Sequence, residues 1–354
     1  MKPARFPLIV CALLVSALLP PTVSAHHSVP ANFDMSTTVE VEGVIQSISW
    51  RNPHVKLKVL ANPGTADEQV WEIESHSISN LRRQSVDQSV LVVGDPVRLA
   101  GLPGRRKDNY VFMQNLLLKD GREIIFEAGI KPRYSDVLVG EADALFDPKK
   151  AGSADERPTT IFAIWTTDYD DLGSWPVFSF TTDGHPVTSR AEAIMDAHDI
   201  DADDPLANCA PKGMPSAMSQ PYPIQLIDEG NSIVLKIEEY DAMRRIHLQD
   251  THEPGNEPPS HLGYSSGRWD GGTLTVTTTN VDYGFFNVLA APKPIPQSAD
   301  IRIVETFRLR DGGEYLDYTM TVTDPTMLTQ PMTYEKFWQW SPGATIEPYV
   351  CAPD

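Results

Sequence analysis

The sequence has few basic residues, few cysteines and no long apolar run, and each shortage excludes a class of protein. Its 29 Lys and Arg residues stand against 48 Asp and Glu residues, which gives a formal net charge of −19. A strongly acidic surface repels phosphate backbones and anionic lipid headgroups, so we expect no binding to nucleic acid. The longest apolar run, residues 8–19, falls short of the roughly 20 residues that span a bilayer as a helix. We therefore expect no membrane insertion.

The N-terminus has the layout of a secretory signal peptide. Lys2 and Arg5 form a basic start, residues 8–19 form the apolar run, and Val23-Ser24-Ala25 supplies small residues for cleavage. We predict that residues 1–25 are removed, that the mature chain begins at His26, and that the protein is periplasmic or secreted.

Two of the three cysteines, Cys209 and Cys351, remain after this cleavage. An even pair in an exported chain is most simply a disulfide, with two free thiols as the alternative. The pair lacks the C-x-x-C spacing of a redox-active site. Closing so long a loop would stabilise the fold by about 4–5 kcal/mol in the chain-entropy model.

The hydrophobic pattern predicts a mainly β protein with two β domains. In residues 26–130, three alternating strands are followed by a short helix at 79–86 and two more strands. That order is typical of an OB-like five-stranded barrel. Residues 209–354 carry closely spaced strands, which predict an antiparallel up-and-down barrel or a sandwich.

Short turns and a charged linker complete the predicted organisation. Asp270-Gly271-Gly272 and Asp311-Gly312-Gly313 indicate tight hairpins within the second β domain. Residues 131–208 read as a linker with a small mixed segment. It includes possible short strands at 159–165 and 175–180, and a helix near 190–198 begun by a capping box of Ser189 and Glu192.

Histidines near the mature N-terminus form a candidate metal site. His26 would carry the free α-amine, with His27 beside it, and His54 in Asn52-Pro53-His54 or His76 could add a further nitrogen. An amine with a pKa near 8 and an imidazole with a pKa near 6.5 both offer nitrogen lone pairs at neutral pH. Copper(II) prefers such ligands, so copper is the cofactor that the sequence suggests. The alternative is a frayed terminus and a turn histidine.

A second candidate site lies in the C-terminal half and would bind a small-molecule ligand. Its members are polar or aromatic residues on one strand, on the loop after it and on the next hairpin: Arg245, His247, Asp250, His252, Trp269 and Asp270. Such a cluster at a barrel mouth could bind an anion or carry out acid–base chemistry. A solvated strand face with a structural Arg–Asp pair is the alternative.

The segment Gly263-Tyr264-Ser265-Ser266-Gly267 matches the G-x-S-x-G pattern of hydrolases. That pattern supplies a nucleophile only at a turn between a strand and a helix. A hairpin follows here instead, so we do not assign Ser265 as a nucleophile.

Several motifs resemble a family of exported bacterial proteins known only as a domain of unknown function. The N-terminal motifs are Ala25-His26-His27-Ser28, Phe33-Asp34, Gly43, Trp50 and Asn52-Pro53-His54. A companion module is similar at residues 209–215, 244–247, 266–274, 323–325 and 349–351, so the likeness covers most of the mature chain. It implies no reaction or ligand. His261 and Gly271 depart from the pattern, where we expect an aromatic residue and an acid, and this weakens any catalytic role for the hairpin.

The sequence thus favours a non-enzymatic exported protein that binds a small ligand or acts as an accessory module. One alternative is a copper-binding protein that uses the mature N-terminal histidine. The other is a hydrolase, lyase or isomerase with its site in the C-terminal barrel.

Overall fold

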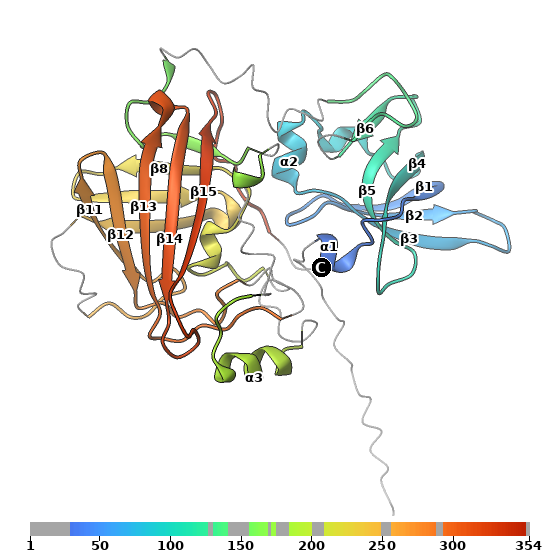
Figure 1. Cartoon of the computed structure of the whole chain (residues 1–354). Coiled ribbons are helices and arrows are strands. Elements are labelled where there is room, and N and C mark those ends of the chain that lie inside the picture. The colour runs from blue at the N-terminus through green and yellow to red at the C-terminus, as the bar shows by residue number, and fades with distance from the viewer. Residues whose placement is uncertain are drawn as a thin grey trace, which may run out of the picture.

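A computed structural model describes residues 29–126, 130–140, 156–168, 171–174, 184–199, 209–248, 256–287 and 293–351. Within these ranges the chain is mainly β and forms two barrels, so the predicted fold class is confirmed. Figure 1 shows the smaller barrel in blue and cyan and the larger one in yellow to red. No helix in the described ranges is long and apolar enough to cross a membrane.

The N-terminal barrel has the strand order of an OB-like fold. Strand β1 pairs with β2 and β4, β2 with β3, and β4 with β5, all antiparallel, and a parallel pairing of β3 with β5 closes the barrel. Helix α2 (Ile78–Arg83) lies between β3 and β4, and β6 (Glu123–Ile125) extends the sheet beyond β5. The five barrel strands are β1 (Val39–Ser49), β2 (Lys56–Ala61), β3 (Gln69–Glu74), β4 (Pro96–Pro103) and β5 (Tyr110–Leu117).

Alternation along the strands fills this barrel with aliphatic side chains. Val41 and Ile45 of β1 and Leu57 and Val59 of β2 are buried in one core, while the intervening Glu42 and Lys58 are exposed. Gly43 permits the close approach of the two strands, because a Cβ atom there would lie 2.3 Å from the Leu60 carbonyl oxygen. The interior therefore has the aliphatic packing that its sequence pattern predicts.

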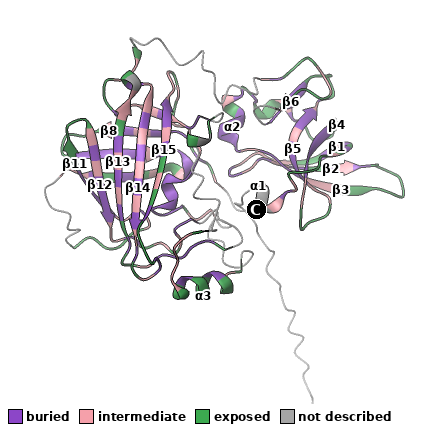
Figure 2. Cartoon of the chain, viewed as in Figure 1, coloured by how far each residue is buried: buried purple, intermediate pink, exposed green. Residues whose placement is uncertain are grey.

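The C-terminal barrel is closed by nine strands in the order β10-β11-β12-β13-β14-β15-β7-β8-β9. Neighbouring strands are antiparallel, except that β10 and β11 pair in parallel. Strand β7 (Ile164–Thr166) comes from within residues 131–208, the segment that the sequence separates from this domain. The other strands are β8 (Ile224–Asp228), β9 (Ser232–Ile237), β10 (Ala242–His247), β11 (Tyr264–Asp270), β12 (Thr273–Thr279), β13 (Arg302–Arg310), β14 (Tyr315–Thr323) and β15 (Met332–Trp340). Figure 2 shows buried and exposed residues alternating along these strands.

Helix α3 (Ser189–Ala197) confirms the predicted helix, but its cap lies one residue earlier than expected. Thr188, not Ser189, is the N-cap, and its side-chain oxygen accepts a hydrogen bond from the Ala191 N–H at 3.3 Å. The reason is that the backbone of Thr188 is extended, whereas Ser189 already belongs to the helix. The strand expected at residues 175–180 lies outside the described residues.

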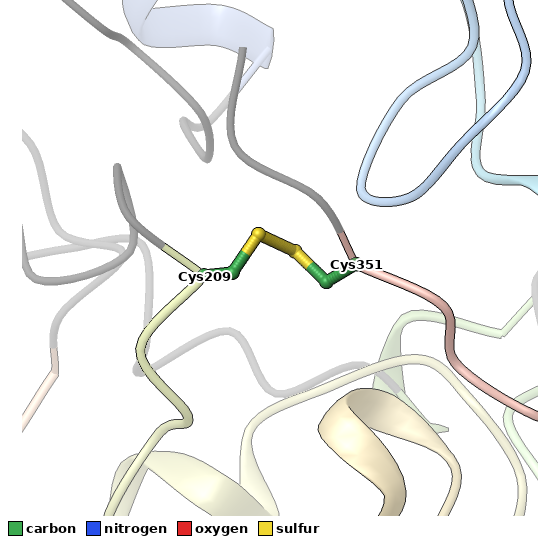
Figure 3. The surroundings of a disulfide bond; sticks show 2 residues. All are labelled: Cys209 and Cys351. Atoms are coloured by element: carbon green, nitrogen blue, oxygen red, sulfur yellow. A yellow bond between two sulfur atoms is a disulfide. The ribbon is translucent and has the colours of Figure 1, made fainter.

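The disulfide between Cys209 and Cys351 is present, with the two Cα atoms 6.0 Å apart (Figure 3). It fastens the C-terminal segment beside the N-terminal barrel, where the Asn52 N–H donates to the Val350 carbonyl at 3.1 Å. A second contact joins the barrels nearby, because Arg83 of α2 forms an ion pair with buried Glu238. The two domains therefore meet next to the Asn52-Pro53-His54 motif.

Candidate functional site

Arg245 and His247 of the predicted ligand site lie on the outer face of β10. Arg245 is half exposed, forms an ion pair with Glu229 and donates to the Ser232 hydroxyl at 2.6 Å. The His247 ring stacks on Tyr264, with centroids 4.9 Å apart. These contacts occupy the Arg245 guanidinium and cover one face of the His247 ring.

Trp269 and Asp270 lie farther along β11, at the turn into β12. His247 pairs with Ser266, so Trp269 is three residues beyond the point where the two strands meet. Its ring makes an edge contact with Phe162, at a centroid distance of 6.1 Å. Asp250 and His252 are outside the described residues. Four of the six predicted residues are therefore described, and they lie in two places: two on β10 and two at the far end of β11.

His54, the predicted metal ligand after Pro53, is nearly buried beside the N-terminal barrel. Its Nδ1 atom is 2.8 Å from the Ser75 carbonyl oxygen and 3.4 Å from Oε1 of Glu74. Since a carbonyl oxygen only accepts, Nδ1 carries the hydrogen and the lone pair of the neutral ring is on Nε2. Glu74 is fully buried and accepts a further hydrogen bond from the Tyr110 hydroxyl. Ser75 and Glu74 therefore fix both the orientation and the tautomer of the imidazole.

A second histidine packs on the same aromatic ring. The His76 ring packs edge-on against Phe112 with the ring centroids 5.2 Å apart, and the His54 ring does so with the centroids 6.3 Å apart. Phe112 belongs to a small core with Phe33 and Leu102, and Val29 of α1 (Val29–Asn32) packs against that core. The start of the described chain thus packs on the same small core that both imidazoles contact.

His26 and His27, the other predicted ligands, lie outside the described residues. Among the residues that are described, no group of three or more His, Cys, Asp or Glu side chains is placed to hold a metal ion. A metal site at His54 therefore needs ligands from beyond the described ranges.

The interior of the C-terminal barrel contains a charged network that the sequence analysis did not identify. Arg244 forms an ion pair with Glu305, and both side chains are almost completely buried. The arginine also donates to the Ser265 hydroxyl at 2.8 Å and to the Thr278 hydroxyl at 2.6 Å, and the Tyr318 hydroxyl donates to Glu305 at 2.8 Å. Ser265 is thus a buried strand residue in this network, in agreement with its exclusion as a nucleophile.

The Glu305 carboxylate keeps the Arg244 guanidinium charged. Burial alone would lower the pKa of the Arg244 guanidinium, but the Glu305 carboxylate raises it above its ordinary value. Burial and the same carboxylate raise the pKa of Tyr318 well above 10. The sequence carried a signal for this network, because strand alternation places Arg244 on the same face as Ile246 and Glu305 on the same face as Phe307.

An open groove of about 690 Å³ runs over the outer face of β12 to β15. Its lining includes Phe337, Thr306 and Asp317, and the Asp317 carboxylate is already bound by Arg308 and Arg310. Glu335 and Lys336 also line the groove, and no ion pair to either is found among the described residues.

Comparison with known proteins assigns one part of the chain. Residues 14–111 match the model described as a family of unknown function, DUF6152. No curated protein and no solved structure matches the chain. The match extends from the apolar N-terminal run to the first residues of β5, so it includes the Asn52-Pro53-His54 motif, His76 and Tyr110. The resemblance to a domain of unknown function is therefore confirmed for residues 14–111, which match this family model.

Proposed function

We propose that the chain is an exported accessory protein that binds copper through its mature N-terminal histidine together with His54 and His76. The observation that carries the proposal is the fixed imidazole of His54. Its Nδ1–H is held by the Ser75 carbonyl at 2.8 Å, which leaves Nε2 as the ligand atom. Histidines that bind metals usually donate their other ring N–H to a carbonyl or carboxylate in this way.

The position of α1 supports a contribution from His26. Val29 packs on the core that contains Phe112, the ring on which both His54 and His76 pack. His26 is three residues before Val29, and three extended residues span at most about 10 Å. Cleavage after Ala25 would therefore place the new terminus only three residues before the core on which both imidazoles pack.

The chemistry of this donor set favours copper among the divalent metals. An α-amine and imidazoles are nitrogen donors, and copper(II) binds such donors in a tetragonal arrangement more tightly than its first-row neighbours do. The buried Glu74 carboxyl group lies 3.4 Å from Nδ1 of His54, on the side of the ring away from Nε2. We do not extend the proposal to a reaction.

The alternatives based on Arg245 and His247 receive less support. A hydrolase, lyase or isomerase needs an acid or base directed into a cavity, whereas Arg245 is paired with Glu229 on the outer barrel face.

The test is the metal content of protein exported and cleaved in a bacterial periplasm. Mass spectrometry first establishes whether the mature chain begins at His26. We expect near-stoichiometric copper by elemental analysis and a tetragonal copper(II) signal with nitrogen ligands by electron paramagnetic resonance.

Three variants separate the proposed ligands from the rest of the chain. One extra residue before His26, or the substitution His54→Ala, should lower copper affinity by more than about tenfold. His247→Ala is the matched control, because that ring lies on the outer face of the other barrel, and it should leave binding unchanged. Full retention of copper by the extended protein, or no copper in the cleaved wild-type protein, would refute the proposal.

A further inference from the structure

A lysine interrupts the aromatic inner face of β15. Burial alternates along this strand and places Lys336 on the same face as Trp338. Lys336 is only 5% exposed and Trp338 is fully buried. The lysine Nζ atom lies 4.3 Å from the centroid of the Trp338 ring. A buried lysine usually requires a partner, because taking its charge out of water is costly.

Two buried donors on this face have no hydrogen-bond partner among the described residues. They are Nζ of Lys336 and Nε1 of Trp338, two residues apart on one side of the strand. The described ion pairs include none to Lys336, although one does join Arg244 to Glu305. Most buried polar groups in folded proteins are satisfied, so two adjacent unsatisfied donors point to a missing acceptor.

The charged groups of the barrel interior do not supply that acceptor. Glu305 already receives hydrogen bonds from Arg244 and from the Tyr318 hydroxyl. Tyr318, which pairs with Lys336 across β14 and β15, and Tyr334 on β15 are its titratable neighbours on the inner face of these two strands. Burial raises the pKa of both phenols, so they are neutral at physiological pH and supply no counter-charge to the lysine.

We propose that the interior of the C-terminal barrel binds an apolar monocarboxylate, with Lys336 as its counter-ion and the Trp338 indole N–H as its second donor. This site is separate from the proposed copper site in the N-terminal domain. A carboxylate offers the acceptors that both donors lack. Aliphatic and aromatic side chains of the barrel core, among them Leu316, Phe307 and Met320, suit an apolar tail. The interior of an eight-stranded barrel is either filled by side chains or holds one small ligand, and nine strands enclose a wider interior.

Binding should be linked to proton uptake. Burial lowers the pKa of Lys336 to about 7, so a large fraction of the amine is neutral at neutral pH. A bound carboxylate favours the ammonium form and raises that pKa. The affinity should therefore decrease as the pH is raised from 7 to 9, while Arg244 stays charged and Tyr318 and Tyr334 stay neutral.

The experiment is calorimetric titration of the full chain, disulfide intact, with butanoate, octanoate and dodecanoate. Octanol and dodecanol are the matched probes that lack the carboxylate. We expect at least one of the two longer carboxylates to bind about tenfold more tightly than its alcohol. We also expect proton uptake when the titration is repeated in buffers of different ionisation enthalpy.

Variants then assign the binding to the two donors. Lys336→Met keeps an unbranched side chain, one atom shorter, and removes the amine, so it should weaken carboxylate binding by more than about tenfold and abolish the proton uptake. Trp338→Phe should weaken binding several-fold. The control Lys293→Met changes an exposed lysine that pairs with Asp196 and should have no effect.

Three outcomes would overturn the proposal. The first is that none of the three carboxylates binds to folded wild-type protein. The second is equal affinity for carboxylates and their alcohols, and the third is undiminished binding by Lys336→Met. Near-ultraviolet circular dichroism of each variant shows whether the barrel is folded. The pH dependence of binding to the wild-type protein tests the role of the amine without any substitution.

Discussion

The two barrels differ in where they place buried charge. In the N-terminal barrel the core is aliphatic, and the buried carboxylates of Glu74 and Glu123 lie where strands meet loops and accept hydrogen bonds from neighbouring groups. In the C-terminal barrel, Arg244 and Glu305 face the interior itself. A five-stranded barrel has room for little beyond aliphatic side chains, whereas nine strands enclose space that a charged network can occupy.

Each arrangement implies a different dependence on its charges. An interior ion pair is costly to break, because the remaining charge stays buried without its partner. A peripheral carboxylate that accepts backbone N–H groups instead holds a loop in place. Three substitutions, ordered from the largest expected effect to the smallest, test this difference.

The largest effect is expected for Arg244→Met. The substitution leaves the fully buried Glu305 carboxylate with the Tyr318 hydroxyl in place of its counter-ion. We expect a loss of about 3–5 kcal/mol in the free energy of unfolding. Urea unfolding followed by tryptophan fluorescence, with the disulfide intact, measures it.

The double variant Arg244→Met, Glu305→Met is the matched control. Replacing both partners by apolar residues removes the unpaired charge, so most of the lost stability should return. If Arg244→Met alone lowers the free energy of unfolding by less than about 1 kcal/mol, the interior ion pair does not stabilise the barrel as we infer.

A smaller effect, with a defined pH dependence, is expected for Glu123→Gln. The buried carboxylate of Glu123 accepts hydrogen bonds from the N–H groups of Arg133, Tyr134 and Ser135, at 2.7–3.1 Å. Burial alone would raise the pKa of Glu123, but these donors and the Asn115 amide lower it below its ordinary value of 4.5. The carboxylate therefore stabilises the fold at pH values above 4.5, and this contribution is lost as the pH falls through the lowered pKa.

We expect Glu123→Gln to cost about 1–3 kcal/mol at pH 7, because the amide accepts fewer hydrogen bonds than the carboxylate. The difference from the wild-type protein should shrink steadily between pH 5 and pH 3. Urea unfolding at a series of pH values measures it, and an exposed acid such as Asp120 changed to Asn serves as the control. A difference that stays constant with pH would contradict the inferred ionisation of Glu123.

The sequence predicted the parts of the fold that depend on local pattern. Strict alternation in β14, alternation in the first half of β12, and the Gly271-Gly272 turn were sufficient to place those strands. The parallel pairing of β10 with β11 and the entry of β7 into the barrel left no local signal, because both depend on contacts between distant segments.

In the candidate sites too, the sequence predicts what depends on local pattern and misses what depends on contacts between distant segments. The sequence singled out His54 by its motif, but its partners Ser75 and Glu74 become visible only when β2 pairs with β3. Lys336 was accessible from the sequence, because alternation places it with Tyr334 and Trp338 on an otherwise aromatic face. The pattern alone does not predict the burial of Lys336, because a single lysine in a strand ordinarily faces the solvent.

The smallest effect is expected one residue away from the largest. Arg245 follows Arg244 on β10 but faces outward, and its ion pair with Glu229 is about half exposed on both sides. Solvent and salt screen such a pair, so Arg245→Ala should change the free energy of unfolding by less than about 1 kcal/mol. Glu229→Ala should have an effect of the same size, and both should become smaller at high salt.

Arg245→Ala also sharpens the comparison between the two sides of one strand. If Arg245→Ala lowered the free energy of unfolding as much as Arg244→Met does, the Arg245–Glu229 ion pair on the outer face of β10 would have to be shielded from solvent. If Arg245→Ala is nearly neutral and Arg244→Met is not, the difference between adjacent arginines measures how strongly the barrel interior depends on its charges. The same urea titrations, run at low and high salt, decide between these outcomes, since only an exposed pair weakens appreciably as salt is added.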